Sequence, residues 1–124
     1  SVVKELVHKC PEDFLLLTGD DATAIDFLLC GGHGGISVTA NIAPAELQRA
    51  YLAAISGNKE LAKEINNKLE NLHKNLFIES NPIPVKWALH MMGKCQKGIR
   101  LPLLMLSEES QPVVLNDLEE LGVL

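Results

Sequence analysis

The chain has 124 residues, a formal net charge of −5, 47% hydrophobic residues and 22% charged residues. This length suits one globular domain with a modest core. The acidic balance and the lack of a basic stripe argue against nucleic-acid binding, and no apolar run is long enough to span a bilayer, so we expect neither a nucleic-acid nor a membrane partner. Three cysteines without paired spacing, Cys10, Cys30 and Cys95, fit a reducing cytosol and predict a cytoplasmic protein.

The first forty residues predict two strands joined through a helix. Residues 2–9 have the spacing of an amphipathic helix, and the apolar run 14–17 is typical of a strand buried on both faces. A helix follows over 22–30, and the β-branched run 35–39 predicts a second strand. Two strands connected in this way form one parallel βαβ unit.

The rest of the chain predicts helices. Pro44 can occupy the first turn of a helix that Gly57 ends. Further along we expect, in order, a helix over 58–77, a rigid extended connection at 81–84, a helix over 85–92, an extended packed segment at 99–106 and a short helix over 114–121.

A single βαβ unit is not expected to be stable by itself, because a two-stranded parallel sheet cannot bury its own faces and edges. The simplest interpretation is an α/β fold: the last two strands of a (β/α) barrel, followed by a helical appendage. The alternative is a small helical protein with two strands lying on it. Because the chain starts within a helical pattern and without Met, we expect it to be cut from something longer.

Three motifs invite a chemical interpretation. The glycines of 31–35 follow a helix and precede a strand, so they predict helix termination rather than a phosphate cradle, with His33 a structural or surface histidine. Asp20 and Asp21 end a strand, where barrel enzymes place their chemistry, so they are helix caps or acid–base groups. Lys86 predicts a packed, hydrogen-bonded lysine, since a Schiff-base lysine needs burial near the reacting carbonyl. We predict no metal site.

Five sequence blocks, taken together and in order, closely resemble the carboxyl-terminal portion of the dihydrodipicolinate synthase (4-hydroxy-tetrahydrodipicolinate synthase) family. They are GDDA at 19–22, GGHG at 31–34, ISVTAN at 36–41, NPIPVKWA at 81–88 and RLPL at 100–103. Two positions depart from the family pattern: Gly35 stands where Val is usual, which should loosen the start of its strand, and Met105 stands where Pro is expected.

The resemblance implies a (β/α)8 TIM barrel with a carboxyl-terminal helical subdomain. Residues 1–56 would hold helix 6, strand 7, helix 7, strand 8 and helix 8, and residues 57–124 would form the subdomain. The family is a lyase of lysine (diaminopimelate) biosynthesis that condenses pyruvate with L-aspartate-4-semialdehyde. A lysine on the sixth strand forms a Schiff base with pyruvate, a tyrosine and two hydroxyl residues relay protons, and an arginine binds the second substrate.

The same resemblance implies that this chain contributes a pocket wall, with no catalytic residue, no metal and no cofactor. Gly19 and Asp20 would lie beside the second-substrate site, and the main chain of Ile36 beside pyruvate. The lysine, tyrosine and arginine would lie outside the chain, so the chain alone should be inactive. Asp26 and Cys30 match a region near the weaker subunit interface of a homo-oligomer, expected to be a tetramer.

Two other functions stay open at this stage. The chain could be a non-catalytic half-barrel that pairs with itself or with another half to bury its open edges. It could also belong to a related branch of pyruvate aldolases that uses another aldehyde acceptor. The block at 81–86 argues against the second alternative, but acceptor specificity would reside mostly outside this chain.

Overall fold

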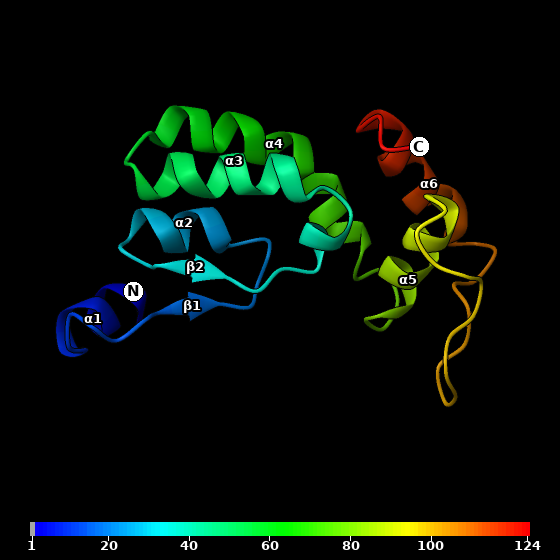
Figure 1. Ribbon diagram of the computed structural model, residues 1–124, viewed down its shortest axis with the longest axis horizontal. Coiled ribbons are helices and arrows are strands. Elements are labelled where there is room, and N and C mark those ends of the chain that lie inside the picture. Colours follow the sequence, from blue (N-terminus) through cyan, green and yellow to red (C-terminus); the bar gives the residue numbers. More distant parts are fainter. Residues whose placement is uncertain (1) are drawn as a thin grey trace.

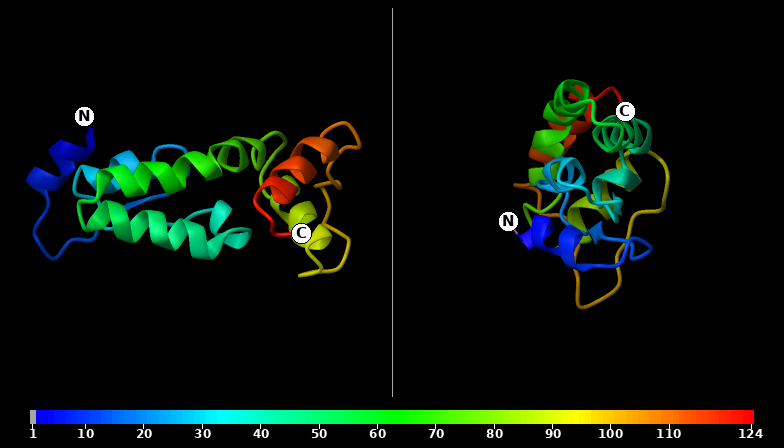
Figure 2. Two further views of the ribbon diagram at one scale, coloured as in Figure 1. Left: turned by 90° about the horizontal axis from the view of Figure 1, so that it is seen from above. Right: turned by 90° about the vertical axis from the view of Figure 1, so that its left-hand side faces the viewer.

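The structure, a computed structural model, describes residues 2–124 as an elongated molecule with α1 at one end and α5 and α6 at the other (Figures 1 and 2). No helix within these residues is both long and apolar enough to cross a membrane. In chain order the elements are α1 (Val2–Lys9), β1 (Leu17–Thr18), α2 (Ala24–Leu29), β2 (Gly34–Gly35), the 3-10 helix η1 (Thr39–Asn41), α3 (Pro44–Ile55), α4 (Lys59–Asn75), α5 (Ile83–Met91) and α6 (Gln111–Glu120).

The two strands pair in parallel, which confirms the predicted strand–helix–strand unit. Leu17 lies opposite Gly34 in the register of β1 and β2. The pairing continues past β2, where the Ile36 amide donates to the Thr18 carbonyl oxygen at 2.8 Å. The segments that follow β1 and β2 therefore leave the sheet at the same end.

The predicted strands over 14–17 and 35–39 are wrong in extent and in burial. Leu16 is buried, whereas Phe14, Leu15 and Leu17 are exposed, so the first run is not covered on both faces. The second run ends as a strand after Gly35, because the backbone turns into η1 and its amides bond to Asp21 instead of to a neighbouring strand. No element among residues 2–124 covers the exposed apolar side chains of 14–17.

Helices α3 and α4 run antiparallel beside each other (Figure 1). Gly57, with φ of +81°, makes the turn between them, and the Asn58 side chain caps α4 by accepting a hydrogen bond from the Leu61 amide at 3.2 Å. The apolar residues that recur at helical spacing along α4 form a stripe that is exposed at Leu61 and buried at Ile65, Leu69, Leu72 and the C-cap residue Leu76.

Two apolar clusters hold the helices together. The larger one joins η1 and α3 to the later helices and contains Ile42, Ala43, Leu47, Leu69, Leu72, Leu76, Val85, Trp87, Ala88, Leu106, Val114 and Leu118. The smaller one joins α2, α3 and α4 through Ile25, Leu28, Ala50, Ala53, Ala54, Ala62 and Ile65. Both clusters therefore draw residues from before and after position 57.

The last third of the chain is fastened to α4 by polar contacts as well as apolar ones. Asn75, at the end of α4, donates from Nδ2 to Asp117 Oδ2 of α6 at 2.8 Å. The expected extended connection at 81–84 is wrong at its end, because α5 begins at Ile83 and accepts a proline in its first turn. The segment 99–106 holds no strand, as predicted, but the expectation that it is packed is wrong, because Leu101 and Leu104 are exposed and only Leu106 is buried.

Candidate functional site

The three residues that the resemblance assigns to a pocket wall lie at one end of the sheet. Gly19 and Asp20 directly follow β1, and Ile36 directly follows β2. All three are exposed, and the Ile36 side chain keeps 75% of its accessible surface. The hydrogen bond from the Ile36 amide to Thr18 brings Ile36 beside the backbone that leads into Gly19.

Asp20 shapes the turn before α2. Its Oδ2 accepts hydrogen bonds from the Thr23 amide at 3.1 Å and the Thr23 hydroxyl at 2.6 Å. Thr23, and not an aspartate, occupies the N-cap position of α2, and its own side chain makes no capping bond. The expectation that Asp20 or Asp21 is the N-cap of this helix is therefore wrong. Asp20 accepts hydrogen bonds from the N-cap residue Thr23, and Asp21 bonds to residues that follow β2.

Asp21 is buried and bonds to the chain that follows β2. Only 3% of its surface is exposed. Its Oδ1 accepts from the Ser37 hydroxyl, and its Oδ2 accepts from the Val38 amide at 2.9 Å and the Thr39 amide at 3.2 Å. A buried carboxylate with three donors is satisfied without a cation. Asp21 therefore joins the ends of the two strands.

The polar network continues from Thr39 into α4. The Thr39 hydroxyl lies 2.7 Å from His73 Nδ1, and His73 Nε2 lies 3.1 Å from Asn66 Oδ1. An amide oxygen can only accept, so Nε2 carries a proton. The Thr39 hydroxyl can either donate to Nδ1 or accept from it, so this contact fits a neutral and a charged ring alike. Burial lowers the pKa of His73, and the charges of Asp21, Asp20 and Glu70 oppose that shift.

The lowered pKa of His73 predicts a pH dependence of stability. Because its folded pKa lies below the ordinary 6.5, the unfolded chain binds a proton here more readily than the folded chain does. The free energy of unfolding should therefore fall as the pH drops below about 6.5. Urea titrations between about pH 5 and pH 7 should show a smaller fall for His73→Gln than for the unchanged chain. An identical pH slope in both proteins would contradict the assignment.

Tyr51 closes the space behind β2. A Cβ atom added to Gly35 would lie 2.7 Å from Tyr51 Oη and 3.0 Å from Cε2, so the ring needs a glycine there. Burial, followed by the negative charge of Asp21, raises the pKa of Tyr51 to about 12, which keeps the phenol protonated. Gly35 was expected to loosen the start of its strand. The structure gives a separate reason for glycine at this position, because any larger side chain would collide with Tyr51.

The glycine-rich segment ends α2, as predicted. Gly31 has φ of +105°, a left-handed conformation that suits glycine directly after the C-cap residue. His33 has a structural role, also as predicted, because its Nδ1 accepts from the Leu16 amide at 2.9 Å while its own amide donates to the Leu16 carbonyl oxygen at the same distance.

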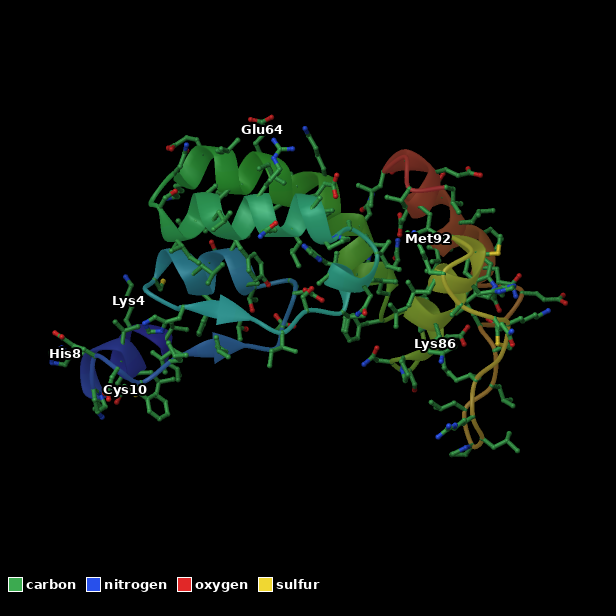
Figure 3. All side chains as sticks on the ribbon, viewed as in Figure 1. Lys4, His8, Cys10, Glu64, Lys86 and Met92 are labelled. Atoms are coloured by element: carbon green, nitrogen blue, oxygen red, sulfur yellow. The ribbon has the colours of Figure 1, made fainter. Side chains whose placement is uncertain are left out.

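The lysines of the chain offer no buried amine. All of them, Lys86 included, are exposed residues. Lys86 lies on α5, remote from the two strands along the length of the molecule (Figure 3). Within residues 2–124 its ammonium group has no hydrogen bond or ion pair, so the prediction of a packed, hydrogen-bonded lysine is wrong. In the same residues, no three His, Cys, Asp or Glu side chains gather closely enough to hold a metal ion.

Sequence reasoning missed the network around Asp21, although two signals for it were present. Ser37 and Thr39 supply donors just after one strand, and Asp21 follows the neighbouring strand, so parallel pairing predicts their meeting. His73 stands four residues after Leu69, on the apolar stripe of α4, which is the spacing of a buried position.

Comparison with known proteins gives one consistent family. The model of the Dihydrodipicolinate synthetase family matches residues 1–121. The 4-hydroxy-tetrahydrodipicolinate synthase of Ruthia magnifica subsp. Calyptogena magnifica is 54% identical over all 124 residues, which cover 42% of that protein. The chain therefore spans less than half the length of this curated relative.

Solved structures agree with the sequence comparison. The chloride-inhibited dihydrodipicolinate synthase of Acinetobacter baumannii, complexed with pyruvate, superposes with a TM-score of 0.94 at 46% identity, over 98% of this chain and 42% of that one. The enzyme of Aquifex aeolicus gives a TM-score of 0.94 at 39% identity, over 98% of this chain and 41% of that one.

Proposed function

The chain belongs to the dihydrodipicolinate synthetase family, and from this premise we propose that it forms the carboxyl-terminal part of a pyruvate-dependent Schiff-base lyase. In this proposal it supplies the last two strands of a (β/α)8 TIM barrel and the helical region beyond them. The complete enzyme would condense pyruvate with L-aspartate-4-semialdehyde in the cytoplasm, as a step of lysine biosynthesis.

One observation carries the proposal. The ends of β1 and β2 bring Gly19, Asp20 and Ile36 to one exposed edge, in a chain that superposes with a TM-score of 0.94 on a synthase complexed with pyruvate. Barrel enzymes place their substrates at the carboxyl ends of their strands. We therefore assign Ile36 to the pyruvate side of the pocket, and Gly19 and Asp20 to the side of the second substrate.

The exposed faces of the sheet support the same proposal. Phe14 and Leu15 shortly precede β1 and Leu17 begins it, and all three residues keep at least half of their accessible surface. An open strand edge with apolar neighbours favours pairing with further strands. The chain covers only 42% of the Ruthia magnifica relative, and we propose that the remaining length supplies the strands that pair there.

The chain would contribute no nucleophile to this reaction. A Schiff-base lysine must give up its proton near neutral pH, which usually requires burial or a neighbouring cation. No lysine of this chain lies in or directly after β1 or β2, although barrel enzymes place their chemistry at the carboxyl ends of their strands. We therefore place the reacting lysine, together with the proton-relaying tyrosine, in the remainder of the enzyme, and we expect the chain alone to be inactive.

The assembled enzyme is proposed to be a homo-oligomer, with a tetramer as the specific expectation. Asp26 is exposed on α2 and Cys30 is half-buried directly after it, on the surface that we assign to the weaker contact between subunits. Mass photometry of the assembled enzyme would distinguish a tetramer from smaller assemblies.

A chimera tests the proposed function. The segment of the Ruthia magnifica enzyme that aligns with this chain is replaced by the 124 residues, and the condensation of pyruvate with aspartate-semialdehyde is measured. We expect the chimera to be active, and we expect the remaining portion of the relative to be inactive when it is assayed without these 124 residues. An inactive but folded chimera would contradict the proposal. Together with a stable dimer of the isolated chain, that outcome would favour the half-barrel alternative, whereas activity with another aldehyde alone would favour the aldolase branch.

A further inference from the structure

We propose that Asp21 is a positioning residue of the pocket: its buried carboxylate fixes the backbone directly after Ile36 and thereby aims the Ile36 carbonyl oxygen at bound pyruvate. This inference rests on the proposed function, and it concerns a residue that touches no substrate. With 3% of its surface exposed, Asp21 lies too deep to meet one.

The geometry holds Ile36 from both sides. On its amino side, the Ile36 amide donates to the Thr18 carbonyl oxygen at 2.8 Å. On its carboxyl side, the next three residues all donate to the Asp21 carboxylate, through the hydroxyl of Ser37 and the amides of Val38 and Thr39. Charge-assisted hydrogen bonds of this kind are stronger than neutral ones. The backbone is therefore held by hydrogen bonds on both sides of the peptide between Ile36 and Ser37.

The Ile36 carbonyl oxygen is available to a ligand. No donor among residues 2–124 bonds to it, although the residue sits between two strongly held neighbours. A carbonyl oxygen with a fixed direction and no protein partner can accept a hydrogen bond. Pyruvate itself carries only acceptor oxygens, so the donor would be the N–H of the protonated imine that bound pyruvate forms in the proposed reaction. Small displacements of such a group matter, because a shift of about 1 Å can cost up to about a hundredfold in rate.

A second support lies behind Asp21. The Ser37 oxygen also accepts from the Ala40 amide at 3.0 Å, which tightens the turn into η1. The Thr39 hydroxyl contacts His73 of α4 at 2.7 Å. The turn is thus tied to the long helix as well as to β1, and the loss of Asp21 would release the end that lies next to Ile36.

The test uses the active chimera and compares three variants. Asp21→Ala removes the acceptor of all three donors. Asp21→Asn keeps an oxygen for the two amides and turns the Ser37 hydroxyl into an acceptor. Asp117→Ala is the matched control, since Asp117 is also 3% exposed and hydrogen-bonded but lies on α6. Steady-state kinetics are measured for both substrates, together with the thermal midpoint of each variant.

We expect Asp21→Ala to raise the KM for pyruvate by roughly tenfold to a hundredfold, with a smaller change in the KM for the aldehyde. Asp21→Asn should recover most of that loss. Asp117→Ala should lower the thermal midpoint and leave both KM values unchanged. If Asp21→Ala lowers only the thermal midpoint, or if Asp21→Asn is as impaired as the alanine variant, the positioning role is wrong.

Two further outcomes keep the test decisive. If Asp21→Ala does not fold, Ser37→Ala removes one of the three donors to Asp21, together with the acceptor of the Ala40 amide. A roughly threefold rise in the KM for pyruvate supports the role, and an unchanged KM overturns it. If the unsubstituted chimera is inactive, the proposed function fails. If the chimera is active and its KM for pyruvate does not change when Asp21 is substituted, only this inference fails.

Discussion

Leu69→Ala should lower the free energy of unfolding of the chain by about 2–5 kcal/mol. Leu69 is fully buried in the larger apolar cluster, which also contains residues of α3, α5 and α6. Truncation removes the transfer free energy of the side chain and leaves a cavity that helices from several parts of the chain would have to collapse to fill. Urea denaturation followed by circular dichroism measures the change.

Leu61→Ala on the same helix is the matched control. Leu61 keeps 38% of its accessible surface, so the same truncation loses less buried area and leaves no enclosed cavity, and it should cost clearly less than Leu69→Ala. Equal losses for the two variants would contradict the placement of the larger cluster between α4 and the later helices. A change in the denaturant slope of either variant would show that the compactness of the denatured or the folded state had changed, or that unfolding was no longer two-state.

Gly35→Val should lower the free energy of unfolding by about 1–3 kcal/mol, the usual cost of overpacking. The added Cβ would lie 2.7 Å from Tyr51 Oη, 3.0 Å from Cε2 and 3.2 Å from Cζ. The Tyr51 ring cannot move freely, because it packs against both apolar clusters. The resemblance described above leads us to expect valine at this position, and the close approach of Tyr51 is a structural reason for glycine in this chain.

A double-mutant cycle with Tyr51→Ala isolates that contact. Valine at position 35 should cost less when the ring is absent, with a coupling energy of about 0.5–3 kcal/mol. Gly34→Val serves as the strand control, because a Cβ there would meet only the end of the Leu17 side chain, at 3.2 Å. If Gly35→Val costs the same with and without the ring, the clash with Tyr51 is not its cause.

Local patterns predicted the elements of this chain well. The helical spacings of 2–9 and 58–77, the proline at 44 and the glycines at 31 and 57 correspond to observed helices and their ends. These features are local, since helix periodicity and left-handed glycines act within a few residues. The same locality explains why a strand over 35–39 was predicted: β-branched residues favour a strand, but the bonds to Asp21 turn the backbone into η1.

The candidate site was predictable only in part. The positions of Gly19, Asp20 and Ile36 at one edge follow from parallel pairing, which the sequence indicated. The different environments of Asp20 and Asp21 could not be predicted, because the two residues are identical and adjacent. Asp20 is exposed to solvent, whereas Asp21 is buried against the turn after β2. The partnership of Thr39 with His73 spans 34 positions and depends on how α4 packs.

The central claim is that this chain forms a wall of a pyruvate pocket whose nucleophile lies elsewhere in the enzyme. Borohydride trapping of the active chimera with pyruvate tests it directly, because borohydride reduces the imine between a lysine Nζ and the carbonyl carbon of pyruvate to a stable amine. Peptide mass spectrometry should find the adduct on a lysine of the relative's portion, with every lysine of these 124 residues unmodified. An adduct on any lysine of this chain, Lys86 above all, would contradict the account.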